Sequence, residues 1–229
     1  MMKLLPSLFA LLVTCVTPLI TSSAAFAQDV KGDAKVGERK IAMCIGCHGI
    51  AGYQASFPEV YKVPKISGQG AKYIVSALNA YKQGERKHPT MRGIADSLSD
   101  QDMADVAAYY STHGVDANAA APGKVADATG KAADLVKKGA CVSCHGESFS
   151  KPIDPSYPKI AGQHADYLFV ALKSYKVEGN PQVGRSNGVM AGIAKQFTNA
   201  EMKEMATYIS KLPGDLKVVR QDSFRLSSH

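Results

Sequence analysis

The chain has 229 residues, and its 27 lysines and arginines outnumber its 20 aspartates and glutamates, which gives a formal net charge of +7 at pH 7. The positive residues are scattered along the chain rather than gathered in one stretch, so the sequence predicts no binding to nucleic acid. Beyond the N-terminal segment, no apolar stretch approaches the length of a membrane span. We therefore expect a mature protein that is soluble, or at most peripherally associated with a membrane.

Residues 1–27 have the pattern of a secretory signal peptide. Lys3 supplies the positive start, an apolar stretch runs from Leu4 to Ile20, and Ala25-Phe26-Ala27 forms an A-x-A cleavage site. Cleavage after this site removes Cys15 and leaves four of the five cysteines in the mature chain. We expect the mature protein to lie in the periplasm.

The four remaining cysteines belong to one motif, Cys-x-x-Cys-His, which occurs twice. The two copies are Cys44-Ile45-Gly46-Cys47-His48 and Cys141-Val142-Ser143-Cys144-His145. This motif is typical of covalent c-type haem attachment, because two thiols at this spacing reach both vinyl groups of one porphyrin and the histidine falls beneath the iron. The sequence therefore predicts two covalently bound haem c groups, with His48 and His145 as axial ligands of the irons.

Two other interpretations of the cysteine pairs compete with haem attachment: a redox-active dithiol and a zinc site. A thioredoxin-type dithiol would be expected in a βαβ context, and none is visible in the sequence. A zinc site could combine both pairs, but it would leave the histidine after each pair unexplained.

The surroundings of the motif are also repeated, which indicates two domains. The segment Pro64-Lys65-Ile66-Ser67-Gly68-Gln69 is echoed by Pro158-Lys159-Ile160-Ala161-Gly162-Gln163, and Met91-Arg92-Gly93-Ile94-Ala95 by Met190-Ala191-Gly192-Ile193-Ala194. We predict the following division: signal peptide 1–27, N-terminal domain 28–113, linker 114–128, C-terminal domain 129–212 and a polar tail 213–229. The sequence assigns no function to the tail.

Within each copy the apolar pattern is helical. A short amphipathic helix leads into the haem motif, and a middle helix is predicted over about 71–83 and again over about 165–177. A last helix begins at Ser99 and again at Thr198, where Thr198 and Glu201 form a capping box. No stretch shows sustained alternation, so no strands are predicted. The fold class is all-α.

Two methionines are candidates for the sixth ligand of each iron. Met91 and Met190 occupy matching places in the repeat, in segments that we predict to be loops. A thioether ligand favours the reduced iron and raises its potential, whereas a second histidine would lower it. Three other methionines lie on predicted helix faces and fit core packing better: Met103, Met202 and Met205.

Histidines compete with the methionines for this position. His88 precedes Met91 by three residues but has no counterpart in the second copy. We expect four histidines to be solvent-exposed rather than ligating: His88, His113, His164 and His229.

The chain resembles the dihaem cytochrome c4 family, which consists of two tandem class I cytochrome c domains. The resemblance lies in the two Cys-x-x-Cys-His-Gly runs, in Pro158-Lys159-Ile160-Ala161-Gly162-Gln163-His164 and in Leu98-Ser99-Asp100-Gln101-Asp102-Met103-Ala104-Asp105. It implies that the carbonyl groups of Pro64 and Pro158 accept hydrogen bonds from His48 and His145, which would fix the orientation of both rings. It also implies that Gly37 lets the first and last helices cross near Tyr109 or Tyr110.

The resemblance further implies that the haem propionates face each other across the domain boundary. Four tyrosines are candidates to reach them, although buried packing explains these residues equally well: Tyr73, Tyr81, Tyr167 and Tyr175.

An iron held by histidine and methionine has no open position, so the predicted function is one-electron transfer and not catalysis. We expect a monomeric carrier between a quinol-oxidising complex or dehydrogenase and a terminal oxidase or reductase. The alternatives are an electron-accepting subunit of a larger dehydrogenase and a dihaem enzyme of the peroxidase or thiosulfate-oxidising type. Residues 117–229 carry 15 basic and 10 acidic residues. This excess fits attraction to an acidic redox partner or simple solvation.

Overall fold

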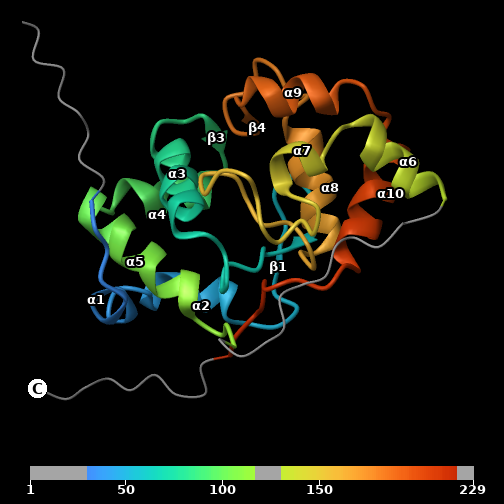
Figure 1. Cartoon of the computed structure of the whole chain (residues 1–229). Coiled ribbons are helices and arrows are strands. Elements are labelled where there is room, and N and C mark those ends of the chain that lie inside the picture. The colour runs from blue at the N-terminus through green and yellow to red at the C-terminus, as the bar shows by residue number, and fades with distance from the viewer. Residues whose placement is uncertain (1–29, 117–129, 221–229) are drawn as a thin grey trace, which may run out of the picture.

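The computed structural model describes residues 30–116 and 130–220, which form two helical bodies side by side (Figure 1). We call them the first half and the second half. The predicted signal peptide, most of the predicted linker and the end of the tail lie outside the described residues. No helix within the described ranges is long and apolar enough to cross a membrane.

Each half contains the predicted helices together with short elements that the sequence did not reveal. The first half contains α1 (Ala34–Glu38), α2 (Ala42–His48), β1 (Gln54–Ala55), β2 (Tyr61–Lys62), α3 (Ala71–Lys82), β3 (Arg86–Lys87), α4 (Pro89–Asp96) and α5 (Asp100–Thr112). The second half contains α6 (Lys131–Lys138), α7 (Val142–His145), α8 (Ala165–Ser174), β4 (Gly184–Arg185), α9 (Gly188–Ala194) and α10 (Asn199–Ser210).

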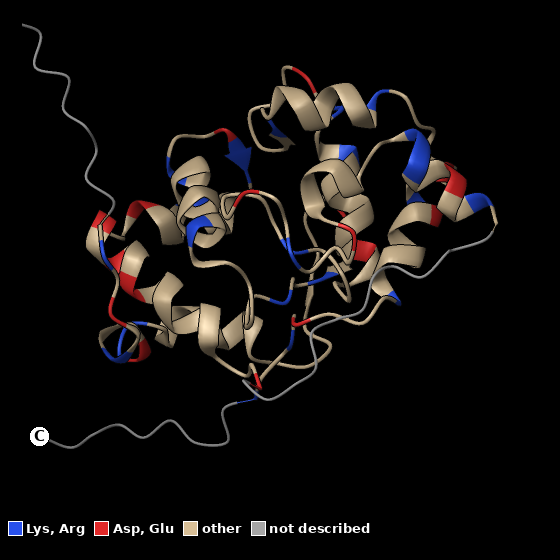
Figure 2. Ribbon diagram, viewed as in Figure 1, with Lys and Arg blue, Asp and Glu red and all other residues tan. Residues whose placement is uncertain are grey.

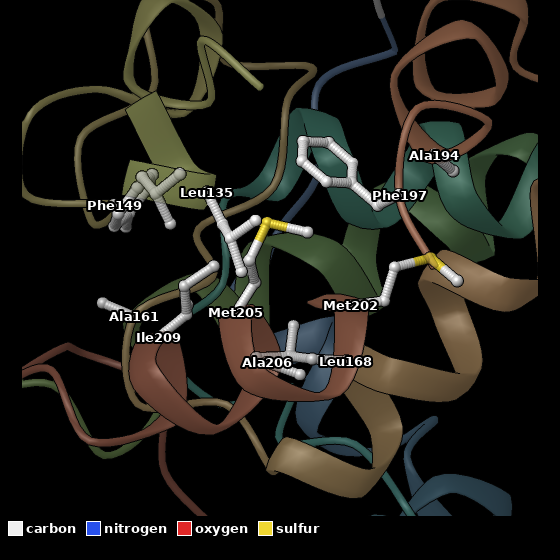
Figure 3. Close-up of a cluster of buried hydrophobic side chains, with 11 residues drawn as sticks. Leu135, Phe149, Ala161, Leu168, Ala194, Phe197, Met202, Met205, Ala206 and Ile209 are labelled. Atoms are coloured by element: carbon white, nitrogen blue, oxygen red, sulfur yellow. The ribbon is translucent and has the colours of Figure 1, made fainter. Parts of the chain in front are cut away.

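The last helix of each half supplies most of its core. In α5, Met103 and Val106 are buried, and in α10 the side chains of Met202 and Met205 are buried beneath Phe197 and Leu135 (Figure 3). These are the faces that the helical periodicity predicted, and the three methionines assigned to core packing do lie in the core.

Caps and a close helix contact explain where α5 and α10 begin and how α1 packs. The Ser99 and Thr198 side chains accept hydrogen bonds from the third residue of their helices, and both form capping boxes. A Cβ atom at Gly37 in α1 would overlap the carbonyl oxygen of Asp105 and lie 3.0 Å from the Cβ atom of Tyr109. The expected close approach at Gly37 is therefore confirmed.

The strands were not predicted, because each has only two residues and no alternating pattern can develop over that length. β1 and β2 pair within the first half. β3 and β4 pair antiparallel between the two halves, with Arg86 opposite Arg185. Here the pairing depends on a contact between segments that lie far apart in the sequence.

Two repeated glutamines make the most regular contact between the halves. The Gln69 side chain accepts from the Lys159 N–H and donates to the Lys159 carbonyl, at 2.9 Å each. The Gln163 side chain makes the same two bonds with Lys65, also at 2.9 Å each. We call this arrangement of Gln69 and Gln163 the glutamine clasp.

The segment after α10 returns to the first half instead of leaving the molecule (Figure 1). The Lys217 N–H donates to the Ser67 carbonyl at 3.0 Å, Leu216 is buried, and Asp215 forms an ion pair with Lys159 at 2.7 Å. The prediction of a polar tail was therefore incomplete, because residues 213–220 pack against the rest of the protein.

Candidate haem centres

The first Cys-x-x-Cys-His motif is carried by α2. Cys44 and Cys47 lie on one helical turn, both are half-buried, and Cys44 packs against the core of the first half. His48 is the last residue of α2. One turn of helix therefore presents both thiols and the imidazole to the same region.

The backbone fixes the ring orientation and the tautomer of His48. Its Nδ1 atom lies 2.7 Å from the Pro64 carbonyl oxygen, which can only accept, so Nδ1 carries the proton and Nε2 has the free lone pair. Burial lowers the pKa of His48, and the hydrogen bond to Pro64 opposes that change only in part. A neutral imidazole with a free Nε2 is the form that binds iron.

The second motif has the same arrangement on a shorter helix. Cys141 precedes α7, Cys144 lies within it, and His145 ends it with 9% of its surface exposed. The Nδ1 atom of His145 donates to the Pro158 carbonyl at 3.0 Å. The structure thus brings each motif histidine together with the proline that the family resemblance pairs with it.

The two candidate methionines lie in helices, so the prediction that they occupy loops was wrong. Met91 is in the first turn of α4 and Met190 in the first turn of α9, and both are half-buried. Each helix is short, and its N-terminus depends on a capping side chain, so the apolar pattern was too brief to reveal it. The Met91 N–H donates to His88 Nδ1 at 3.4 Å, and the Met190 N–H donates to Asn187 Oδ1 at 3.0 Å.

The competing histidines have structural contacts, so the expectation of solvent exposure was wrong for the three that are described. His88 caps α4, and His113 stacks on Tyr109 with ring centroids 4.6 Å apart. His164 is half-buried before α8, and His229 lies outside the described residues.

The donor set of each half fits a haem c. Burial raises the pKa of Cys44 and of Cys141 to about 11, whereas a redox-active dithiol needs a lowered thiol pKa. In the described parts of the chain, no three histidine, cysteine, aspartate or glutamate side chains converge on a metal position, so the two cysteine pairs do not form a joint zinc site. An imidazole and a thioether in each half are the ligands that a low-spin haem iron takes.

Sequence reasoning missed two arginines at the boundary between the halves, where β3 pairs with β4. The Arg86 guanidinium donates to Tyr73 Oη at 3.1 Å and to Tyr167 Oη at 3.2 Å, and Arg185 donates to Tyr167 Oη at 3.1 Å. The signal was present, since each arginine precedes its candidate methionine by five residues. Tyr73 and Tyr167, named as candidates to reach propionates, therefore lie together at the boundary.

Comparison with known proteins places these features in one family. The family model described as cytochrome c matches residues 35–114 and again 129–213. The cytochrome c4 of Azotobacter vinelandii is 32% identical over 211 residues, which covers 86% of this chain and 97% of the relative. A thiosulfate dehydrogenase electron acceptor of Stutzerimonas stutzeri is 30% identical over 202 residues, covering 85% and 90%.

A solved structure agrees with the sequence matches. The crystal structure of reduced recombinant cytochrome c4 from Pseudomonas stutzeri shares 29% sequence identity and superposes with a TM-score of 0.57, covering 80% of this chain and 100% of that one.

The matches confirm the helical fold of two cytochrome c domains, each with its own Cys-x-x-Cys-His motif, and hence two haem c groups attached at Cys44 and Cys47 and at Cys141 and Cys144. Proteins of this kind transfer electrons to and from redox partners, so the protein is an electron carrier and not an enzyme. The chain belongs to the cytochrome c4 family.

Proposed function

We propose that this protein is a monomeric periplasmic carrier in a respiratory chain. It takes electrons from a quinol-oxidising complex or a dehydrogenase and delivers them to a terminal oxidase or reductase. Residues 1–27 direct export, and residues 28–113 and 129–212 form the two electron-carrying domains. The axial ligand pairs of this proposal are His48 with Met91, and His145 with Met190.

The observation that supports this proposal is that both halves fix an imidazole and a methionine in equivalent ways. Each histidine is held at Nδ1 by a proline carbonyl, at 2.7 Å and 3.0 Å. Each methionine is held by a capped helix start. Two such ligands leave no position for a substrate, which favours a carrier over a peroxidase.

Each haem c, when bound, supplies an iron that takes up and releases one electron. The Pro64 and Pro158 carbonyls keep Nδ1 protonated and the rings oriented, which makes each imidazole a stronger donor. The methionine thioethers favour the reduced state. Since the backbone fixes both kinds of ligand before an electron arrives, little rearrangement opposes its transfer.

Substitution of the methionines tests the ligand assignment. We expect Met91→His to lower the midpoint potential of one haem only, and Met190→His that of the other, within the range of ~0.8 V that axial ligands span. An optical redox titration measures both potentials. The variant Met103→Leu is the control. Met103 lies in the hydrophobic core of the first half, so this substitution should leave both potentials unchanged. An unchanged titration for either histidine variant would remove that methionine from the ligand set.

A second candidate function follows from named relatives. Two of them are described as thiosulfate dehydrogenase electron acceptors, at 30% identity each. In this role the protein would take electrons directly from such an enzyme. Stopped-flow reduction of the oxidised protein by a thiosulfate dehydrogenase with thiosulfate, compared with reduction by a quinol-oxidising complex, distinguishes the two donors. Carbon monoxide binding to the reduced protein would indicate an open iron and contradict both roles.

A further inference from the structure

Tyr110 and Ile209 occupy the same position in the two halves. The Gly68 N–H donates to the Tyr110 carbonyl at 2.8 Å, and the Gly162 N–H donates to the Ile209 carbonyl at 3.1 Å. Both side chains are buried, with 2% and 5% of their surfaces exposed, and each belongs to the core of its half. The backbone contact is therefore the same at both places, but the first half has an aromatic ring with a hydroxyl where the second half has a hydrocarbon side chain.

Each of these side chains shares a core with the first cysteine of a haem motif. Cys44 packs against the cluster that contains Tyr110, and Cys141 packs against the cluster that contains Ile209. In Figure 3, Ile209 lies among apolar side chains. A haem attached at Cys44 therefore has a polar group in its surroundings at a place where the haem attached at Cys141 has a hydrocarbon group.

The Tyr110 hydroxyl lies beside the Cys44 sulfur. It is buried and has no hydrogen-bond partner among the described residues, although a buried hydroxyl destabilises a fold unless it finds one. Burial raises the pKa of Cys44 to about 11, and the Tyr110 hydroxyl opposes this rise in part. Burial also raises the pKa of Tyr110 well above its usual range, so the hydroxyl keeps its proton. Tyr110 is thus a neutral donor next to the sulfur.

The surroundings fix the Tyr110 ring and leave its dipole unopposed along the helix. The ring meets those of Tyr109 and His113 edge-on, with centroids 5.1 Å and 6.0 Å apart. In Figure 2 the acidic residues of α5 lie towards its start, and residues 106–112 of this helix include no charged side chain. No charge on this part of α5 therefore masks the dipole of the hydroxyl.

We propose that Tyr110 donates a hydrogen bond to the Cys44 thioether of the first haem and thereby raises the potential of that haem relative to the second. Once the haem is attached, this sulfur has lone pairs but no proton, so it can only accept. The positive end of the O–H dipole then faces the haem and stabilises the additional electron of the reduced state. Ile209 supplies no such dipole. The inference needs only a haem at Cys44 and does not depend on which donors and acceptors the protein serves.

Removal of the hydroxyl tests this contact. We expect Tyr110→Phe to reduce the ratio of reduced to oxidised first haem at a fixed potential by about threefold, which lowers its midpoint potential by ~30 mV. The second haem should not change. A redox titration followed by NMR measures the two potentials separately, through the haem methyl signals. No shift of the first haem, or an equal shift of both, would overturn the proposal.

Tyr208→Phe is the matched control. Tyr208 is half-buried in α10 and lines an open groove with Ala132, Lys203 and Lys211. Its substitution removes one tyrosine hydroxyl from the last helix of the second half, just as Tyr110→Phe does in the first. We expect both potentials to stay at their wild-type values. A loss in this variant equal to that in Tyr110→Phe would show a general effect of the substitution and contradict the proposal.

The variant Tyr110→Ile separates the hydroxyl from the ring, because it gives the first half the side chain of the second. We expect its first haem to lose at least as much potential as in Tyr110→Phe. A loss in Tyr110→Ile without one in Tyr110→Phe would show that ring packing, and not the hydrogen bond, sets the potential. The near-infrared sulfur-to-iron band is recorded for each variant. Its retention shows intact axial ligation, so a failure here is distinguishable from a failure of the methionine assignment.

The hydroxyl proton gives a readout that packing alone does not. In the reduced wild type we expect a slowly exchanging Tyr110 hydroxyl signal, with a nuclear Overhauser effect to the thioether bridge at Cys44. Tyr110→Phe should lack this signal. A buried water molecule is the competing partner of the hydroxyl. Cross-peaks from the hydroxyl proton to water, without any to the thioether bridge, would contradict the proposal.

Discussion

Asp105 is a carboxylate in the interior of the first domain, with 2% of its surface exposed. It accepts hydrogen bonds from Lys40 Nζ at 2.7 Å, the Asp33 N–H at 2.8 Å and Gln101 Nε2 at 2.9 Å. These bonds tie the start of the domain to α5. At the matching place in the second domain, Glu204 pairs with Lys131 at 3.0 Å, with 34% of the Glu204 side chain exposed. The two domains therefore differ in how they respond to loss of this charge.

At the residue scale, we predict that Asp105→Asn destabilises the first domain by about 2 kcal/mol at neutral pH, because Lys40 loses its buried partner but keeps partial access to water. Burial would raise the pKa of Asp105, but the bonds from Lys40, Asp33 and Gln101 lower it. Its stabilising effect is thus present above the ordinary aspartate pKa of about 4 and is lost as the pH falls through the lowered value. The free energy of unfolding of the variant should therefore fall less steeply than that of the wild type as the pH is lowered into the acid range.

Urea unfolding followed as a function of pH measures both effects. Glu204→Gln is the control and should cost less than about 0.5 kcal/mol, since its ion pair is on the surface. Equal effects of the two substitutions would contradict a special role for the buried carboxylate.

At the scale of elements, the glutamine clasp links each domain to the histidine support of the other. Gln163 holds both backbone groups of Lys65, which directly follows Pro64. The Pro64 carbonyl in turn orients His48. The chain of contacts that fixes the first haem ligand therefore begins in the second domain.

We predict that Gln163→Ala affects the first haem centre more than the second, although the residue belongs to the second domain. Loss of two hydrogen bonds should weaken domain docking by about 2 kcal/mol and speed exchange of the Lys65 amide hydrogen by at least about tenfold. Hydrogen exchange by NMR on the reduced protein measures this rate. Gln69→Ala should produce the mirror effect at Lys159, and a response confined to the substituted domain would exclude coupling through the clasp.

At the scale of the whole molecule, the contacts that join the domains include the clasp, the β3–β4 pairing and the segment after α10. In the last of these, Leu216 has 4% of its surface exposed and lies next to the bridge between Lys217 and Ser67. These contacts give the two haem domains a defined relative position, which electron exchange between them requires.

We predict that Leu216→Ala costs about 2–3 kcal/mol, because it removes a buried side chain from this contact. Calorimetry should show a lower Tm and a transition that begins to separate into two, as the domains become less coupled. Lys217→Ala is the matched control, since its side chain is exposed while its bond to Ser67 uses the backbone. Identical losses in both variants would point to the backbone bridge, not to burial of Leu216.

Local spacing in the sequence was sufficient to identify much of this protein. Two thiols and a histidine within five residues predict a haem site, because the chemistry is contained in one helical turn. The buried face of α5 follows from its 3.6-residue period, and its start from the Ser99 cap. The duplicated segments predicted two similar modules for the same reason, as a repeat is visible without knowledge of any contact.

The tertiary structure alone decided what depends on distant partners. Gln69 bonds Lys159 across 90 residues, and Arg86 bonds Tyr167 across 81. Nothing in the local pattern of either residue specifies its partner, and a two-residue strand such as β3 has no periodicity to detect. The sequence by itself determined the haem motifs, the helical modules and the candidate ligands, because short-range geometry dictates them. How the modules meet, and which charges they share, emerges only when the chain is folded.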